Sequence, residues 1–166
     1  MNTDQKQLEL LYEEVSNKQE NCHYPGETTD SAIEKYIKNG STSHLYLPGT
    51  LDLKSLPSTL KLVGRNLILS NCANLESLPD NLTVIGNANL HRCEKLKSLP
   101  TNLKVGGYLN LEHSGIKRLE QLPDDLRVVG PIKMNGFSEE DISKYQSMRR
   151  KVRRMEDKLP ELKDIF

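Results

Sequence analysis

The sequence predicts an α/β solenoid, in which short parallel strands stack into one sheet and helices cover both ends. Two observations support this fold class. The dipeptide Leu-Pro recurs with successive prolines 22, 21 and 23 residues apart, at Pro57, Pro79, Pro100 and Pro123. After each Leu-Pro come two polar residues, a leucine, a valine/glycine turn and a short alternating segment. Such self-similarity in the low twenties is typical of solenoids, whose repeats bury their apolar edges against one another.

Residues 1–44 are predicted to form an N-terminal helical cap. A first helix is expected over Asp4–Lys18, with one apolar face formed by Leu8, Leu11, Tyr12 and Val15. After a loop over 21–27, a second helix should have Thr29 or Asp30 as its N-cap and stop at Gly40. Its buried face comprises Ile33, Tyr36 and Ile37. We expect these helices to cover the open end of the solenoid. The alternative for the first helix is partner binding or dimerisation.

Residues 45–137 contain about five copies of the alternating segment. They are Leu45–Leu47, Leu67–Leu69, Ala88–Leu90, Leu109–Leu111 and Ile132–Met134. In a strand, the first and third residues of each segment point into the core and the middle residue points outward.

Two further columns of residues, one from each repeat, should also point inward. The first holds small residues that can bond to neighbouring backbone, namely Thr50, Cys72, Cys93 and Ser114. The second holds core leucines, Leu53, Leu75 and Leu96, with Leu119 in this role after a two-residue insertion.

These columns resemble the leucine-rich repeat family. The L-P-x-x-L phrase and the period near 21 are similar to the short bacterial variety found in type III secreted effectors and in small phage and bacterial proteins. The V-G-G-x-L-x-L turn of Val105–Leu111 is most similar to the last group. The resemblance implies a scaffold that binds another protein, with a bacterial or phage origin and a role as inhibitor or effector of a host factor. Effectors of this kind also carry a ubiquitin-ligase domain with a catalytic cysteine, but no cysteine follows Phe137, so we expect no enzyme.

The outward side of the strands is the predicted partner-binding surface, because repeat proteins usually bind there. Its predicted contact residues are Tyr46, Ile68, Asn89, His91, Tyr108, Asn110, Glu112 and Lys133. Exposed Tyr46, Ile68 and Tyr108 among polar groups suggest binding anchors. The alternative for Asn89 and Asn110 is an asparagine ladder that satisfies itself.

His91 and Glu112 occupy one column on adjacent repeats, about 5 Å apart by strand spacing. A charge-assisted hydrogen bond between them is expected in preference to a metal or acid–base site, because zinc needs three or four converging ligands. Cys72 and Cys93 are expected in the core rather than as nucleophiles. The sequence therefore predicts no catalytic residue, no metal and no cofactor.

Residues 138–166 are predicted to form an amphipathic helix and a tail that begins at Glu161. Ser138 and Asp141 have the spacing of a capping box. The apolar stripe, expected to cover the last repeat, comprises Ile142, Tyr145, Met148, Val152, Met155 and Leu159. The polar face carries Arg149, Arg150, Lys151, Arg153 and Arg154. Nucleic-acid binding through this basic helix is the alternative function.

Composition adds three expectations. The chain of 166 residues has 23 basic and 23 acidic residues, so no overall field attracts it to nucleic acid or membrane. Neither a signal peptide nor a membrane-spanning run is apparent in the sequence. Two of its three cysteines lie in a core column, which favours a reduced, cytoplasmic location in the producing cell or, for a phage protein, the host cell.

Overall fold

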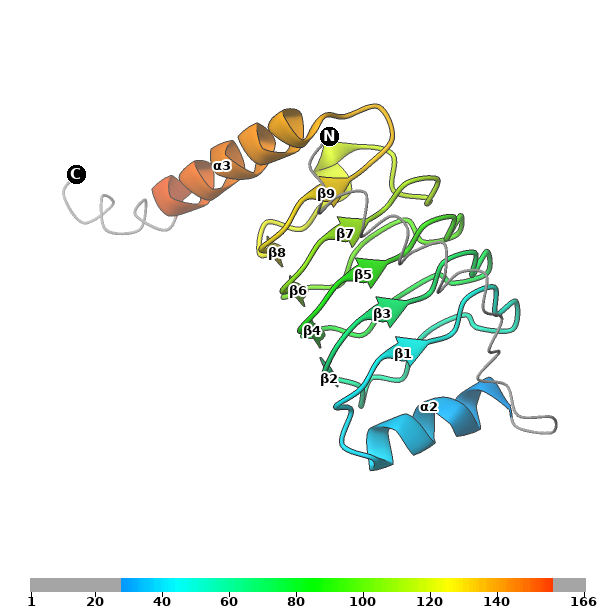
Figure 1. Ribbon diagram of the computed structural model, residues 1–166. Coiled ribbons are helices and arrows are strands. Elements are labelled where there is room, and N and C mark those ends of the chain that lie inside the picture. The colour runs from blue at the N-terminus through cyan, green and yellow to red at the C-terminus, as the bar shows by residue number, and fades with distance from the viewer. Residues whose placement is uncertain (1–27, 157–166) are drawn as a thin grey trace, which may run out of the picture.

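The computed structural model describes residues 28–156 and shows a parallel-strand β-solenoid of about four turns followed by a helix (Figure 1). The helix predicted over Asp4–Lys18, the loop at 21–27 and the tail from Glu161 lie outside the described residues.

The first sheet has five parallel strands, one from each predicted alternating segment. They are β1 (Leu45–Tyr46), β3 (Leu67–Ile68), β5 (Ala88–Asn89), β7 (Leu109–Asn110) and β9 (Ile132–Lys133), in that spatial order. Leu45, Leu67, Ala88, Leu109 and Ile132 are in register and buried. Leu47, Leu69, Leu90, Leu111 and Met134, two residues further along, are buried too. The predicted strands and their inward-facing residues are thus confirmed.

The structure has a second parallel sheet. Its strands lie where the sequence suggested only valine/glycine turns. It comprises β2 (Leu62–Val63), β4 (Thr83–Val84), β6 (Lys104–Val105) and β8 (Arg127–Val128). The valines are in register, and Val63, Val84 and Val105 are buried. The bends do lie at the predicted glycines, but the prediction of one sheet was wrong, because the turn signal of each glycine obscured the two-residue strand that precedes it.

The small polar column points inward as predicted and bonds to leucine carbonyls. Cys72 Sγ donates to Leu47 O at 3.0 Å, and Cys93 Sγ donates to Leu69 O at 3.1 Å, each in the preceding turn. Thr50 and Ser114 donate instead to the leucine three residues before them. These bonds satisfy carbonyls where the strand ladder ends.

The core leucine column continues at Ile116 and not at Leu119. Ile116 is buried in the core, whereas Leu119 is partly buried and begins a short 3-10 helix, η1 (Leu119–Gln121). Gln121 holds this turn, because its Oε1 accepts from the backbone N–H groups of Lys117 and Arg118. The insertion therefore displaces Leu119 toward the surface.

Helix α2 (Thr29–Lys38) lies across the β1 end of the solenoid (Figure 1). Its N-cap is Thr28, one residue before the predicted position, and the Thr28 side chain accepts from Ser31 N. Thr29 is instead buried, and its hydroxyl donates to the Asp52 carboxylate. Ile33 is fully buried within the solenoid core, with Tyr36 and Ile37 packed beside it.

Helix α3 (Glu139–Glu156) begins beside β9 and extends away from the stacked strands (Figure 1). The predicted capping box is confirmed, since Asp141 N donates to Ser138 Oγ and Ser138 N donates to Asp141 Oδ2. Ile142 is buried, but Met148 is 53% and Val152 38% exposed. The prediction that the stripe covers the last repeat is therefore wrong beyond the first turns. The side chain of Met155 and all of Leu159 lie outside the description.

Candidate interaction surface

The outward side of the first sheet, called the strand face below, presents one central residue from each strand. These are Tyr46, Ile68, Asn89, Asn110 and Lys133, which pair in register across the sheet. Lys133 is exposed and Tyr46, Ile68 and Asn110 are half-buried. Asn89, however, is only 8% exposed. The central residues of the strand face are therefore not equally accessible, contrary to the prediction.

The two central asparagines bond to their own strands. Asn89 Oδ1 accepts from the N–H of His91 at 3.1 Å, and Asn110 Oδ1 accepts from the N–H of Glu112 at 2.9 Å. Each side chain therefore bends toward the backbone two residues further along its own chain, and this bond fixes its orientation. The alternative prediction of a ladder between Asn89 and Asn110 was wrong.

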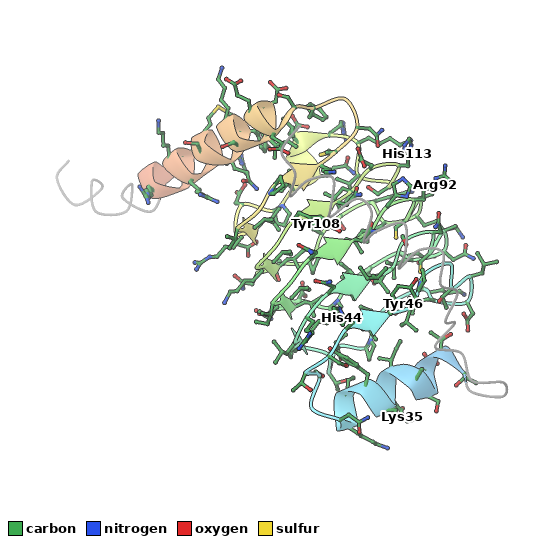
Figure 2. The ribbon with its side chains drawn as sticks, in the orientation of Figure 1. Lys35, His44, Tyr46, Arg92, Tyr108 and His113 are labelled. Carbon is green, nitrogen blue, oxygen red and sulfur yellow. The ribbon has the colours of Figure 1, made fainter. Side chains whose placement is uncertain are left out.

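An asparagine ladder does exist, one column earlier, where the chain enters each strand. Asn66 Oδ1 accepts from Asn87 N at 2.9 Å, and Asn87 Oδ1 accepts from Tyr108 N at 3.0 Å. A Cβ on Gly107 would overlap Asn87 Oδ1, so the ladder needs glycine there. The next residue of the column is Pro131, which has no N–H to donate. The ladder therefore ends at Tyr108. Figure 2 shows Tyr108 and Tyr46 on the strand face.

His91 packs against His113 and does not hydrogen-bond Glu112 among the described residues. The two imidazole rings meet edge to face, with centroids 5.3 Å apart. Burial lowers the pKa of His91, and the nearby charges of Arg92 and His113 lower this pKa further, while Glu112 opposes them. The expected histidine–carboxylate bond is thus replaced by a ring contact at the end of the strands.

Arg92 and His113 lie together where the chain leaves the strands (Figure 2). Both have left-handed backbones, with φ of 58° and 57°, in a column that also contains Gly49, Asn71 and Gly136. Non-glycine residues are uncommon in this region of conformational space. The backbone of this column nevertheless extends the ladder, because Arg92 N donates to Glu112 O at 2.9 Å.

Neither cysteine of the core has the character of a nucleophile. Burial raises the pKa of Cys72 and raises that of Cys93 to about 12. Both thiols are therefore neutral donors near pH 7, and the thiolate is the reactive form. Within residues 28–156, no three His, Cys, Asp or Glu side chains converge in a way that would hold a metal ion.

The basic residues of α3 do not share one face. Arg149 makes a bidentate pair with Asp124, at 2.7 and 2.6 Å, and thereby ties α3 to the last turn. Arg150, Lys151 and Arg154 are exposed, and the side chain of Arg153 lies outside the description. A basic stripe that continued from α3 across the solenoid would need its cations in one column. The candidates lie instead in three different columns, namely those of Arg65, Arg92 and Lys133.

The outer side of the second sheet carries apolar residues that the sequence interpretation did not single out. Leu62 is 40%, Ile85 57% and Val129 84% exposed. Leu62 lies in β2 and pairs with Thr83, whereas Ile85 and Val129 come directly after β4 and β8. The sequence interpretation did not include the second sheet, and for this reason it did not single out these apolar residues.

No protein-family model, curated protein or solved structure matches this chain. In the part of the chain that the structure describes, every helix is too short or too polar to cross a membrane.

Proposed function

We propose that this chain is a non-catalytic binding module of the leucine-rich repeat type, which takes a protein partner on its strand face. In this proposal α2 and α3 act as terminal caps, and the chain works in the cytoplasm of a bacterial cell, either its producer or a phage host. The observation that carries the proposal is the fixed geometry of the strand face.

That geometry comes from hydrogen bonds that continue past each short strand. Leu45 N donates to Asn66 O, Leu67 N to Asn87 O and Leu109 N to Pro131 O, and the Asn66–Asn87 ladder runs alongside. Backbone and side-chain bonds together hold the central residues at the strand spacing of about 4.8 Å. A surface already ordered in this way loses little conformational entropy when a partner binds.

The chemistry of the strand face suits a protein ligand. Tyr46 and Tyr108 contribute aromatic rings, Ile68 contributes an aliphatic side chain and Lys133 contributes a charge at the β9 edge. Partly buried aromatic anchors with polar surroundings are the usual composition of protein-binding hot spots. Small-molecule sites, by contrast, are enclosed cavities.

The test compares capture of cellular proteins by three forms of the chain. One carries Ile68→Glu and Lys133→Glu on the strand face, and a matched control carries Leu62→Glu and Arg127→Glu on the second sheet. We expect the unchanged chain and the control to capture the same protein from a lysate of the producing or host cell, and the strand-face variant to lose it. Equal capture by all three forms, or loss only in the control, would contradict the proposal. Capture of nucleic acid alone, released by modest salt, would favour the basic helix instead.

A further inference from the structure

A groove separates α3 from the last turn of the solenoid. Its volume is about 450 Å³, and its apolar lining comprises Leu119, Phe137, Tyr145 and Met148. Leu119 reaches this groove because the two-residue insertion places it outside the core column, which Ile116 fills. The groove is thus built from the insertion in the last repeat and from the apolar stripe of α3.

The apolar surface continues along α3 beyond the groove. Met148 and Val152 are four residues apart, which places them on one face of the helix, and both are exposed. From Lys144 to Val152 this face runs for about 12 Å at 1.5 Å per residue. Methionine adapts readily to different apolar surfaces. A stripe of this length matches about two turns of a second helix.

Beyond the first turn of α3, the charged residues beside the groove are positive. Every charged residue from Lys144 through Arg154 is basic, and Lys144 and Lys151 flank Met148 at helical spacing. Asp141 lines the N-terminal end of the groove, where hydrogen bonds from Ser138 lower the pKa of its carboxyl group and keep it negatively charged. Arg149 faces the other way, toward Asp124. The groove therefore offers an apolar floor with a cationic border beyond the first turn of α3.

We propose that this groove binds an amphipathic helix with an acidic polar face, contributed by a protein partner. Leucine-like side chains at a spacing of three and four residues would fill the groove, and carboxylates would meet Lys144 and Lys151. Nucleic acid is disfavoured, because Leu119, Phe137 and Met148 offer no donor to a phosphate. This site is separate from the strand face and does not depend on the function proposed for that face.

The probe is a fluorescently labelled 18-residue peptide with leucines at helical spacing and glutamates elsewhere. A control peptide has the same composition with the leucine stripe scrambled. We expect the full chain to bind the first peptide in fluorescence anisotropy, with the scrambled peptide at least about tenfold weaker. Met148→Glu should weaken binding about tenfold or more, and so should Lys144→Glu with Lys151→Glu.

Matched controls separate this site from general charge effects. Lys95→Glu with Lys97→Glu removes two exposed cations from a different turn and should leave binding within about twofold. The strand-face variant with Ile68→Glu and Lys133→Glu should also bind the peptide unchanged. Loss of peptide binding in the groove variants alone would therefore be independent of whether the strand face binds a partner. Should Met148→Glu alter the helix, Val152→Glu supplies a second groove variant, placed on the apolar stripe that continues from the groove.

Three outcomes would overturn the proposal. Equal binding of both peptides, or unchanged binding to both groove variants, would remove the groove as the site. Preferential binding of a DNA duplex would make α3 a nucleic-acid contact. Concentration-dependent dimerisation that Met148→Glu abolishes, seen by sedimentation, would show that a second copy of the chain is the occupant.

Discussion

The two ends of the solenoid carry helices that differ in how much they bury. At one end, Ile33 of α2 is fully buried in the solenoid core and Thr29 bonds to Asp52. At the other end, α3 buries Ile142 but leaves Met148 53% exposed. Both segments have apolar residues at helical spacing, so amphipathicity alone does not determine what a helix covers. Helix α2 thus packs an apolar residue into the solenoid core, whereas α3 leaves part of its apolar face exposed.

The largest effect should come from a change that removes the core on which both ends depend. Leu90→Asp places a charge at a fully buried position in the middle turn and should prevent cooperative folding, a loss of more than about 4 kcal/mol. Circular dichroism and urea unfolding would measure it, with Lys95→Asp on the surface of the same turn as control. A Leu90→Asp chain that unfolds at nearly the same urea concentration as the control would show that the register is wrong.

The comparison of the two ends is tested directly by truncating one side chain in each helix. Ile33→Ala should cost about 2–5 kcal/mol because it leaves a cavity in the core. Met148→Ala should stay within about 0.5 kcal/mol because its side chain is already in water. Urea denaturation of both variants gives the two values. Equal losses would mean that α3 covers its end as tightly as α2 does.

Alkaline pH should lower the free energy of unfolding, because Cys93 lies in the core between the two ends of the solenoid. The pKa of Cys93 is about 12 in the fold against 9.0 as a free thiol, so the folded state holds the proton more tightly. The resulting stability is complete below pH 9 and is lost as the pH rises from 9 toward 12. Cys93→Ser should therefore lose less stability than the unchanged chain between pH 9 and 11 in urea titrations. Parallel pH profiles for the two proteins would refute this assignment.

A small effect should also come from the ion pair that ties α3 to the last turn. Arg149 and Asp124 are 43% and 34% exposed, so solvent screens their attraction. A double-mutant cycle with Arg149→Ala and Asp124→Ala should give a coupling of about 0.2–1 kcal/mol. A coupling above about 2 kcal/mol would instead mean that α3 is held firmly against the solenoid.

The sequence predicted those parts of the molecule that repeat. Leucines at fixed spacing identified the five strands of the first sheet and the inward Cys72 and Cys93, because burial imposes the same requirement on every turn. The second sheet was missed because a glycine follows closely after each of its strands, and this glycine was interpreted as part of a turn that begins at the valine. The position of Ile116 in place of Leu119 was missed because an insertion breaks the period locally.

The surface was less predictable than the core. Alternation correctly placed Tyr46, Ile68 and Lys133 on the outward side. It did not reveal that Asn89 Oδ1 accepts from His91 N or that His91 packs on His113, because both depend on side-chain rotation. The exposure of Met148 depends on the angle at which α3 leaves the last turn, and helical periodicity carries no information about that angle.

The most direct measurement is hydrogen–deuterium exchange on the complex with the captured protein, compared with the free chain. Our account predicts slower exchange in the strand-face segments that contain β3 and β7 when the partner is bound. Protection confined to the second sheet, or to α3 with the strand face unchanged, would contradict the assignment of the strand face as the binding surface.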